Sequence, residues 1–263
     1  MMRFGLIGHP LEGSGSPELF RKAYDGRWPY DLIESASFED SWKRFLSDYQ
    51  AINITAPFKE AAFERILADG GSVSEDAAAI GAVNIAVKSG EGSKEATGSP
   101  AADGIVGYNS DSLGVRALLS RAGFGDGDVA IVAGFGGAGK AAAAAARSLG
   151  MDVTVCNRSR RTLADGSQTR PLEELPVLCA VADILIYTLA MPLEQAIGDG
   201  VAVPAGGLDC GSVSDWGLPA ILEANYRTPC LEGAAEHYIS GREWLLEQAR
   251  AGYALMTGER PEL

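Results

Sequence analysis

The stretch Asp128–Arg158, DVAIVAGFGGAGKAAAAAARSLGMDVTVCNR, decides the predicted fold. Residues rich in valine and isoleucine (128–133) precede the glycines, an alanine run (141–146) follows them, and a second β-branched run (152–156) comes near the end of the stretch. We therefore expect a strand, a turn, a helix and a second strand, in this order. Gly134, Gly136 and Gly139 have the G-x-G-x-x-G spacing, which lets a pyrophosphate approach a helix N-terminus closely. The motif alone is weak, and a tight turn without a ligand is the alternative. The flanking strand and helix favour a dinucleotide site that includes Gly137 and Ala138.

The residues after the second strand of this unit bear on the choice of cofactor. An NAD site usually has an acidic residue there, whereas arginine accommodates the 2′-phosphate of NADP. The chain reads Asn157-Arg158-Ser159-Arg160-Arg161, with no carboxylate until Asp165. A guanidinium binds phosphate well and stacks on adenine, which favours NADP. A solvated basic turn is the alternative.

Composition excludes several classes of function. The net charge of −13 over 263 residues argues against a nucleic-acid partner, because such binding depends on clustered Lys and Arg. No apolar run reaches the length of a membrane span. Neither a signal peptide nor a metal site is expected, and a reducing cytoplasm suits four dispersed cysteines, Cys156, Cys179, Cys210 and Cys230.

Strands and helices alternate along the chain, which predicts an α/β protein with mostly parallel sheets. The composition of residues 89–103 predicts a solvated hairpin or loop. Two domains follow, with a boundary near Gly107, and the cleft between them is the expected active site. In the first half we expect strands at 3–8, 30–35, 51–54 and 82–87 and helices at 17–24, 38–49 and 58–67. In the second half we expect further strands at 184–189 and 207–210 and helices at 112–122, 215–225 and 240–257.

Two polar motifs follow predicted strands. In the first, Ser14 and Ser16 can both donate to one carboxylate, although Ser16 taken alone is better explained as a helix cap. In the second, Asn53 and Thr55 can bind hydroxyl groups, and Lys59 can supply a proton. A lone lysine in a first helical turn is usually just solvated, but this one follows two other polar groups.

Two more motifs lie farther along. Asn84 interrupts an apolar strand, so its buried amide is either a structural bridge or a ligand contact. Asn109 and Asp111 lie at the domain boundary, where Asp111 either caps a helix or faces the cleft as the partner of Lys59. An ammonium paired with a carboxylate beside a carbonyl is what reversible ketone reduction requires.

Taken together, these motifs resemble the shikimate dehydrogenase family over nearly the whole chain. The family's S-x-S, N-[VI]-T-x-P-x-K, G-A-V-N and N-[TS]-D-x-x-G are similar to residues 14–16, 53–59, 81–84 and 109–114. The glycine loop follows in the expected order. The last helix is similar to the family's G-x-x-M-L-x-x-Q-A, with Gly241, Leu245, Gln248 and Ala249.

The resemblance implies NADPH-dependent reduction of 3-dehydroshikimate to shikimate, in the chorismate pathway of aromatic amino acid biosynthesis, by a monomer or homodimer. It implies that the C-terminal helix returns to the first domain, giving a substrate domain of residues 1–107 and 235–263 and a Rossmann NADP domain of residues 108–234. The implied roles are carboxylate binding by Ser14 and Ser16, substrate contacts by Asn53, Thr55, Asn84, Asn109 and Gln248, catalysis by Lys59 and Asp111, and cofactor contact by Thr188.

The chain departs from the family pattern near the nicotinamide. Residues 186–191 are shortened and lack a glycine, and at the expected D-x-x-Y, Asp209 is followed by Ser212 in place of tyrosine. Ile85 replaces a threonine, and Gly13 stands where a larger polar residue is common. Two alternatives therefore remain, a quinate/shikimate dehydrogenase of broader specificity and a weakly catalytic dinucleotide-binding paralogue that acts as a sensor or partner protein.

Overall fold

The computed structural model describes residues 2–89, 104–163, 165–192, 195–196 and 213–263. They form an α/β protein with two compact units, residues 1–110 with 249–263 and residues 111–248, which confirms the predicted fold class. The boundary after Ser110 lies near the domain boundary expected at Gly107. The boundary after Gln248 lies inside the last helix, α9 (Gly241–Thr257), so this helix belongs to the first unit from Ala249 onward.

The first unit is built on a six-stranded mixed sheet with the order β2-β1-β3-β5-β6-β4. β1 is parallel to β2 and β3, and β4 to β6, whereas β5 is antiparallel to β3 and β6. The carboxyl ends of β1, β3 and β6 and the amino end of β5 therefore meet at one edge. The strands are β1 (Phe4–Gly8), β2 (Tyr30–Glu34), β3 (Ala51–Ile54), β4 (Ser72–Val73), β5 (Ile85–Ser89) and β6 (Gly104–Tyr108).

Local capping sets the limits of several helices in this unit. The Ser37 hydroxyl accepts from Asp40 N at 3.2 Å and begins α2, and Ser74 caps α4 in the same way. Gly81, with φ +71°, ends α4 in the left-handed conformation that favours glycine. The helices are α1 (Ser16–Ala23), α2 (Phe38–Asp48), α3 (Lys59–Ala68) and α4 (Glu75–Ile80).

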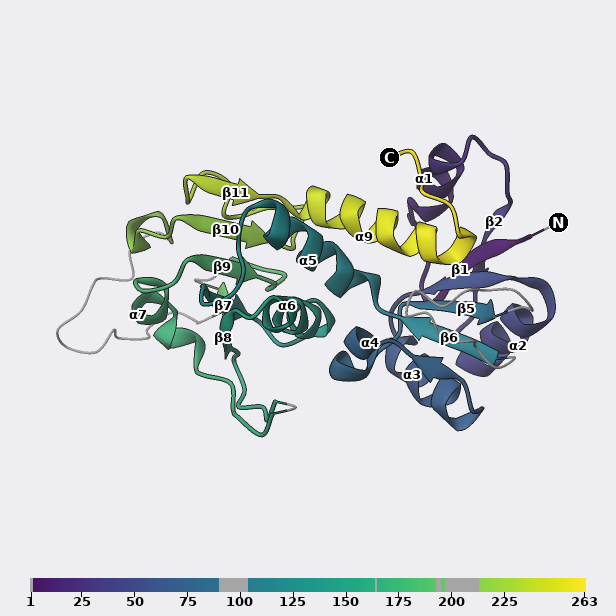
Figure 1. Cartoon of the computed structure of the whole chain (residues 1–263), viewed down its shortest axis with the longest axis horizontal. Coiled ribbons are helices and arrows are strands. Elements are labelled where there is room, and N and C mark those ends of the chain that lie inside the picture. Colours follow the sequence, from purple (N-terminus) through teal and green to yellow (C-terminus); the bar gives the residue numbers. More distant parts are fainter. Residues whose placement is uncertain (1, 90–103, 164, 193–194, 197–212) are drawn as a thin grey trace. The chain divides into compact units, whose positions relative to one another are not determined.

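The second unit has a five-stranded, wholly parallel sheet with the order β11-β10-β9-β7-β8 (Figure 1). Its strands are β7 (Val129–Ala133), β8 (Asp152–Cys156), β9 (Ile184–Tyr187), β10 (Ala220–Glu223) and β11 (His237–Ile239). Its helices, besides the first part of α9, are α5 (Ser110–Arg121), α6 (Gly137–Ser148) and α7 (Leu175–Cys179), with short 3₁₀ turns at Leu172–Glu174 and Val213–Trp216.

Apolar clusters cover both faces of this parallel sheet. Ala130 and Val132 of β7 belong to a cluster with the α6 alanines, whereas Ile131 and Ala133 belong to a second cluster with Leu175 of α7. Successive strand residues point to opposite faces, so burial of both sets explains why β7 reads as a continuous apolar run. The strand–glycine turn–helix–strand prediction for residues 128–158 is confirmed.

The helix expected at residues 215–225 is wrong. The chain makes a 3₁₀ turn at Val213–Trp216 and then the buried strand β10. Gly217 has φ +70°, and Pro219 has no amide hydrogen to donate, so a helix cannot continue through them. The strand expected at 207–210 lies outside the described residues. Asn84 precedes β5 and does not interrupt it, while β4, β6, β11 and α4 were not predicted.

Candidate functional site

The glycine turn between β7 and α6 depends on its glycines for two reasons. Gly134 has φ +102°, and a Cβ at Gly139 would lie 2.1 Å from the Gly134 carbonyl oxygen, so the start of α6 packs directly on the end of β7. A Cβ at Gly136 or Gly137 would have no atom within 4 Å. The backbone at the start of α6 thus faces open space, which fits the approach of a pyrophosphate.

Thr188 closes one side of this turn. Its backbone N and its Oγ1 both donate to the Ala133 carbonyl, at 2.9 and 2.8 Å, and a Cβ on Gly134 would lie 2.6 Å from Thr188 Oγ1. The Tyr187 hydroxyl donates to Met191 O at 2.7 Å. The shortened 187–191 segment is therefore a turn held by its own hydrogen bonds beside the glycines.

The basic segment after β8 is held in a defined shape. Asn157 Nδ2 donates to Ser159 O at 2.9 Å, and the Thr169 hydroxyl accepts from Arg161 N at 3.0 Å and donates to Ser159 O at 3.4 Å. Thr169 is buried, whereas the side chains of Arg158, Arg160 and Arg161 are exposed. Within the described part of the chain, none of these three arginines forms an ion pair with a carboxylate. Such a segment fits a 2′-phosphate.

Ser14 and Ser16 lie together after β1. Ser14 Oγ is 3.3 Å from Ser16 Oγ, and both residues are half-buried. Ser16 is the first residue of α1, Gly15 is the N-cap and has no side chain to cap the helix, and Ser16 N donates to Ser14 Oγ at 3.4 Å. The capping explanation of Ser16 is therefore wrong, and its hydroxyl is directed to other partners.

The second motif follows β3 at the same edge of the sheet. Thr55 N donates to Ile7 O at 2.9 Å, and a Cβ on Gly8 would lie 2.4 Å from Thr55 Cγ2, so the ends of β1 and β3 are in contact. Asn53 lies in β3, and half-buried Lys59 is the first residue of α3. One edge of the first sheet thus gathers hydroxyl, amide and ammonium groups.

Asn84 and Asn109 serve as structural bridges at this edge. Asn84 Oδ1 accepts from Ser110 N at 2.7 Å, and its Nδ2 donates to Ser110 Oγ at 3.2 Å. Asn109 Nδ2 donates to Ala82 O at 3.0 Å. Both asparagines are buried, and Asn84 forms the structural bridge, while its contact with a ligand stays a prediction.

In the second unit, helices α5 and α9 bring Asp111 and Gln248 onto neighbouring turns. A Cβ on Gly114 would lie 2.8 Å from Gln248 N, so only glycine permits this approach. Trp244 stands where the family pattern has methionine. Its Nε1 donates to Asp111 O at 3.1 Å. Lys59 lies in the first unit and Asp111 in the second, so their action as a catalytic pair stays a prediction.

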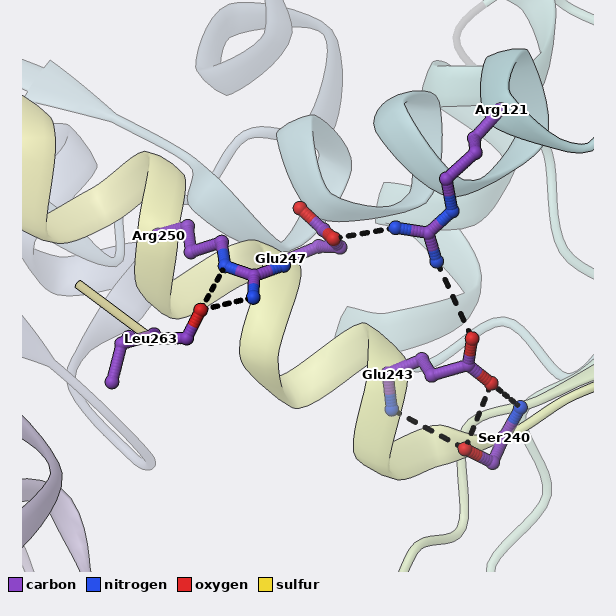
Figure 2. A network of polar contacts seen from close by, with 6 residues as sticks. All are labelled: Arg121, Ser240, Glu243, Glu247, Arg250 and Leu263. Carbon is purple, nitrogen blue, oxygen red and sulfur yellow. Dashed lines mark hydrogen bonds and ion pairs between the residues drawn. The ribbon is translucent and has the colours of Figure 1, made fainter. Parts of the chain in front are cut away.

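Ion pairs fix the first half of α9 on α5 (Figure 2). Arg121 contacts Glu247 Oε1 at 2.7 Å and Glu243 Oε1 at 3.3 Å. Ser240 and Glu243 form a capping box, in which Ser240 N donates to Glu243 Oε2 and Glu243 N donates to Ser240 Oγ. These contacts hold the turn that carries Gln248.

Sequence reasoning missed an acidic residue and a tyrosine at the end of β10. Asp209 and Ser212 lie outside the described residues. β10, which is next to β9 in the sheet, ends at Glu223, and Tyr226 lies three residues later, as the tyrosine does in the D-x-x-Y motif. The Glu223 carboxylate is buried and accepts from Cys230 N, Leu231 N and the Tyr238 hydroxyl at 2.7–3.1 Å. The signal was an acidic residue after a short apolar run.

Sequence reasoning also missed Tyr30. This first residue of β2 belongs to no motif, yet its hydroxyl donates to Asn53 Oδ1 at 2.8 Å. Among the described residues, no group of three or more His, Cys, Asp or Glu side chains is arranged to hold a metal ion. None of the described helices combines the length and apolar character that crossing a membrane requires.

Comparisons with known proteins agree with this arrangement. Residues 6–86 match the shikimate dehydrogenase substrate binding domain family. A relative from Natronomonas pharaonis, named shikimate dehydrogenase (NADP(+)), is 30% identical over 270 residues, covering 97% of this chain and 93% of its own length. A protein of the same name from Archaeoglobus fulgidus is 27% identical, covering 100% of this chain and 95% of its own.

Solved structures give the same result. The crystal structure of shikimate 5-dehydrogenase from Thermus thermophilus, in complex with NADP(H) and shikimate, has a TM-score of 0.75 and 26% sequence identity. The match covers 100% of this chain and 95% of that one. The chain belongs to the shikimate dehydrogenase family.

Proposed function

We propose that this protein catalyses the reversible, NADPH-dependent reduction of 3-dehydroshikimate to shikimate. The observation that carries the proposal is the edge of the first sheet, where paired serine hydroxyls follow β1, the amide of Asn53 lies near the end of β3 and Lys59 begins the helix after it. Hydroxyls and amides suit a carboxylate and ring hydroxyls, and the ammonium suits a ketone oxygen. Relatives that match over nearly the full chain bear this activity in their names.

The substrate contacts follow from the donors available. Ser14 and Ser16, 3.3 Å apart, would both donate to the carboxylate. Thr55 and Asn53 would contact ring hydroxyls, together with Gln248 of α9. Since Asn84 already bonds Ser110 through both side-chain atoms, it would use its remaining amide hydrogen. Asn109 would act indirectly, through the carbonyl of Ala82.

Lys59 and Asp111 would carry the acid–base chemistry. The Lys59 ammonium would stabilise the oxygen that becomes negative as the ketone is reduced, and a proton must reach that oxygen. Asp111 would orient the ammonium and balance its charge. Both a proton transfer and a purely electrostatic role predict a large loss of turnover when Lys59 is removed.

The cofactor contacts would come from the glycine turn and the basic segment. NADPH, when bound, supplies the hydride. Gly134, Gly136 and Gly139 leave room for the pyrophosphate at the start of α6, with Gly137 and Ala138 contributing backbone donors. Arg158, with Asn157 and Ser159, would bind the 2′-phosphate, and Thr188 would lie beside the nicotinamide half.

We also assign the D-x-x-Y position of the family to Glu223-Ala-Asn-Tyr226. Asn225 holds this turn, since its Nδ2 donates to Thr228 O at 2.8 Å and its Oδ1 accepts from Thr228 N at 3.3 Å. Tyr226, 37% exposed, would then supply the tyrosine that was absent at position 212. This assignment removes one of the two departures on the nicotinamide side.

The cellular setting belongs to the same proposal. Cys156, Cys179 and Cys230 are free thiols, which suits a reducing cytoplasm and a role in aromatic amino acid biosynthesis. The protein would act as a monomer or homodimer.

The test is an assay of the purified protein with shikimate or quinate, each with NADP⁺ or NAD⁺, followed by the absorbance of the reduced nicotinamide. We expect the fastest reduction with shikimate and NADP⁺. Preference for quinate would indicate the broader enzyme. Absence of reduction with all four pairs, together with measurable NADP⁺ binding, would overturn the dehydrogenase proposal in favour of the sensor alternative.

A Lys59→Ala variant tests the mechanism. Loss of the ammonium should lower kcat by about two orders of magnitude or more, in the range of other lost electrostatic catalytic contacts. Lys43→Ala, which removes an exposed ammonium from α2, is the matched control. Full turnover by Lys59→Ala would refute the assigned mechanism while leaving the reaction class intact.

A further inference from the structure

The hydroxyl of Tyr30 lies among predicted substrate-binding residues although its own position is part of no motif. Its side chain is on the face of the first sheet that also carries Phe4, and its ring packs 4.7 Å from that of Phe20 in α1, measured between centroids. Burial raises the pKa of the Tyr30 phenol well above its ordinary value. The phenol is therefore neutral at all physiological pH values and has one hydrogen to donate.

That hydrogen is committed to Asn53. Tyr30 donates to Asn53 Oδ1 at 2.8 Å, an ordinary distance for a well-formed O–H···O hydrogen bond. The Ser16 side chain lies near the same phenol and acts to lower its pKa, and Ser14 Oγ lies 3.3 Å from Ser16 Oγ. A chain of contacts thus runs from the two serines through Tyr30 to Asn53, across α1, β2 and β3.

The bond fixes which way the amide of Asn53 faces. A primary amide has one acceptor oxygen and two donor hydrogens. Because the oxygen is turned toward Tyr30, the NH₂ group faces the other way, where it can donate to an oxygen of a bound molecule. Without the phenol hydroxyl the amide is free to flip, and the Asn53 oxygen loses its partner.

We propose that Tyr30 is a positioning residue, which holds Asn53 as a hydrogen-bond donor toward a substrate oxygen and links it to the serines that bind the carboxylate. The inference rests on the proposed function, since it assigns an orientation to one of its substrate contacts. Tyr253 supports the same arrangement from α9, because its hydroxyl donates to Ser16 O at 3.4 Å.

The chain supplies a matched control in Tyr24. This tyrosine packs on the same Phe20 ring, at 5.1 Å, but its hydroxyl bonds Thr257 Oγ1 at 2.8 Å and Glu259 O at 3.0 Å, away from Asn53. Tyr30→Phe and Tyr24→Phe each keep the ring and remove one hydroxyl. Both variants should fold, which thermal melting checks.

The experiment measures shikimate binding by calorimetry in the wild type and both variants, and NADP⁺ binding in parallel. We expect Tyr30→Phe to raise the Kd for shikimate about tenfold, which corresponds to about 1.4 kcal/mol, the scale of one lost hydrogen bond. Tyr24→Phe should bind shikimate as the wild type does, and neither change should alter the Kd for NADP⁺. In steady-state assays the loss should appear in the KM for shikimate more than in kcat.

A double-mutant cycle separates positioning from general destabilisation. Asn53→Ala should weaken binding in the wild type but add little in Tyr30→Phe, because the oriented amide is already lost. Additive losses, or equal Kd values for Tyr30→Phe and Tyr24→Phe, would overturn the inference alone. A wild-type protein that does not bind shikimate would overturn the proposed function and this inference with it.

Discussion

Thr169→Val should reduce the preference for NADP over NAD. Thr169 lies outside the predicted phosphate contacts, but its buried hydroxyl joins Arg161 N and Ser159 O, so it ties together the two ends of the exposed Ser159–Arg161 turn. Valine has nearly the same shape, so the backbone bond from Thr169 N to Arg161 O, at 2.9 Å, should remain. Only the two side-chain bonds are removed.

The expected magnitude follows from those two bonds. The contact with Arg161 N, at 3.0 Å, is a full hydrogen bond worth about 1 kcal/mol net, and the one with Ser159 O, at 3.4 Å, is weaker. If the free energy lost is the energy that orders the turn, the population of the phosphate-binding shape falls by about five- to tenfold. The Kd for NADP⁺ should rise by that factor, whereas the Kd for NAD⁺, which has no 2′-phosphate, should stay the same.

The assay is equilibrium binding of NADP⁺ and NAD⁺ at one fixed ionic strength, because salt screens the attraction between arginine and phosphate. Thr154→Val, which makes the same change in β8, is the control. Equal losses for both nucleotides would mean that the mutation damages the whole unit. No loss for either would show that the turn keeps its shape without Thr169, and the reasoning would be refuted.

Three other predictions concern the second unit. Gly139→Ala should abolish detectable NADP⁺ binding and lower the melting temperature, because the new Cβ would lie 2.1 Å from the Gly134 carbonyl oxygen. Calorimetry and thermal melting check these two effects. Glu223→Gln should lower the free energy of unfolding by about 2–4 kcal/mol, since the new NH₂ group would face a backbone N–H donor. Urea titration measures this loss. The control is Glu232→Gln, which changes an exposed side chain and should cost almost nothing. Burial raises the pKa of the Cys156 and Cys179 thiols to about 12, so both should resist alkylation at pH 8 until the protein unfolds. In the unfolded chain these thiols ionise near pH 8.5, so their raised pKa values do not affect the stability of the folded state below that pH. Above it, the folded state should lose stability relative to the unfolded chain as the pH rises toward 12. Melting temperatures measured across this pH range check the prediction.

The sequence predicted those strands and helices that carry a local signal. β7, α6 and β8 have long apolar runs separated by glycines, and their order was predicted correctly. β10 falls within a predicted helix, because four apolar or acidic residues in a row have no period that separates a strand from a helix. Pairing with β9 and β11 decides its conformation, and that information is not local.

The same limit explains the site residues that were missed. Ser14, Lys59 and the glycines lie in the turns after strands or in the first turn of the following helix, where their residue type is itself the signal. The sequence did not indicate Glu223, because the predicted acidic position of the D-x-x-Y motif is Asp209, in a part of the chain whose spacing differs from the family. The end of the strand beside β9 is a better guide to that position than the count of residues from the preceding motif.

Positioning residues are harder to predict than contact residues for a physical reason. Tyr30, Thr169 and Trp244 carry no local sequence signal of a site, and each has one polar group that needs a partner in the folded chain. In each case one partner is a predicted site residue: Asn53, Ser159 and Asp111. The need to satisfy a buried polar group and the need to hold a site residue still are thus met by the same hydrogen bond. A sequence reveals the polar atom, but only the folded chain shows which group it holds.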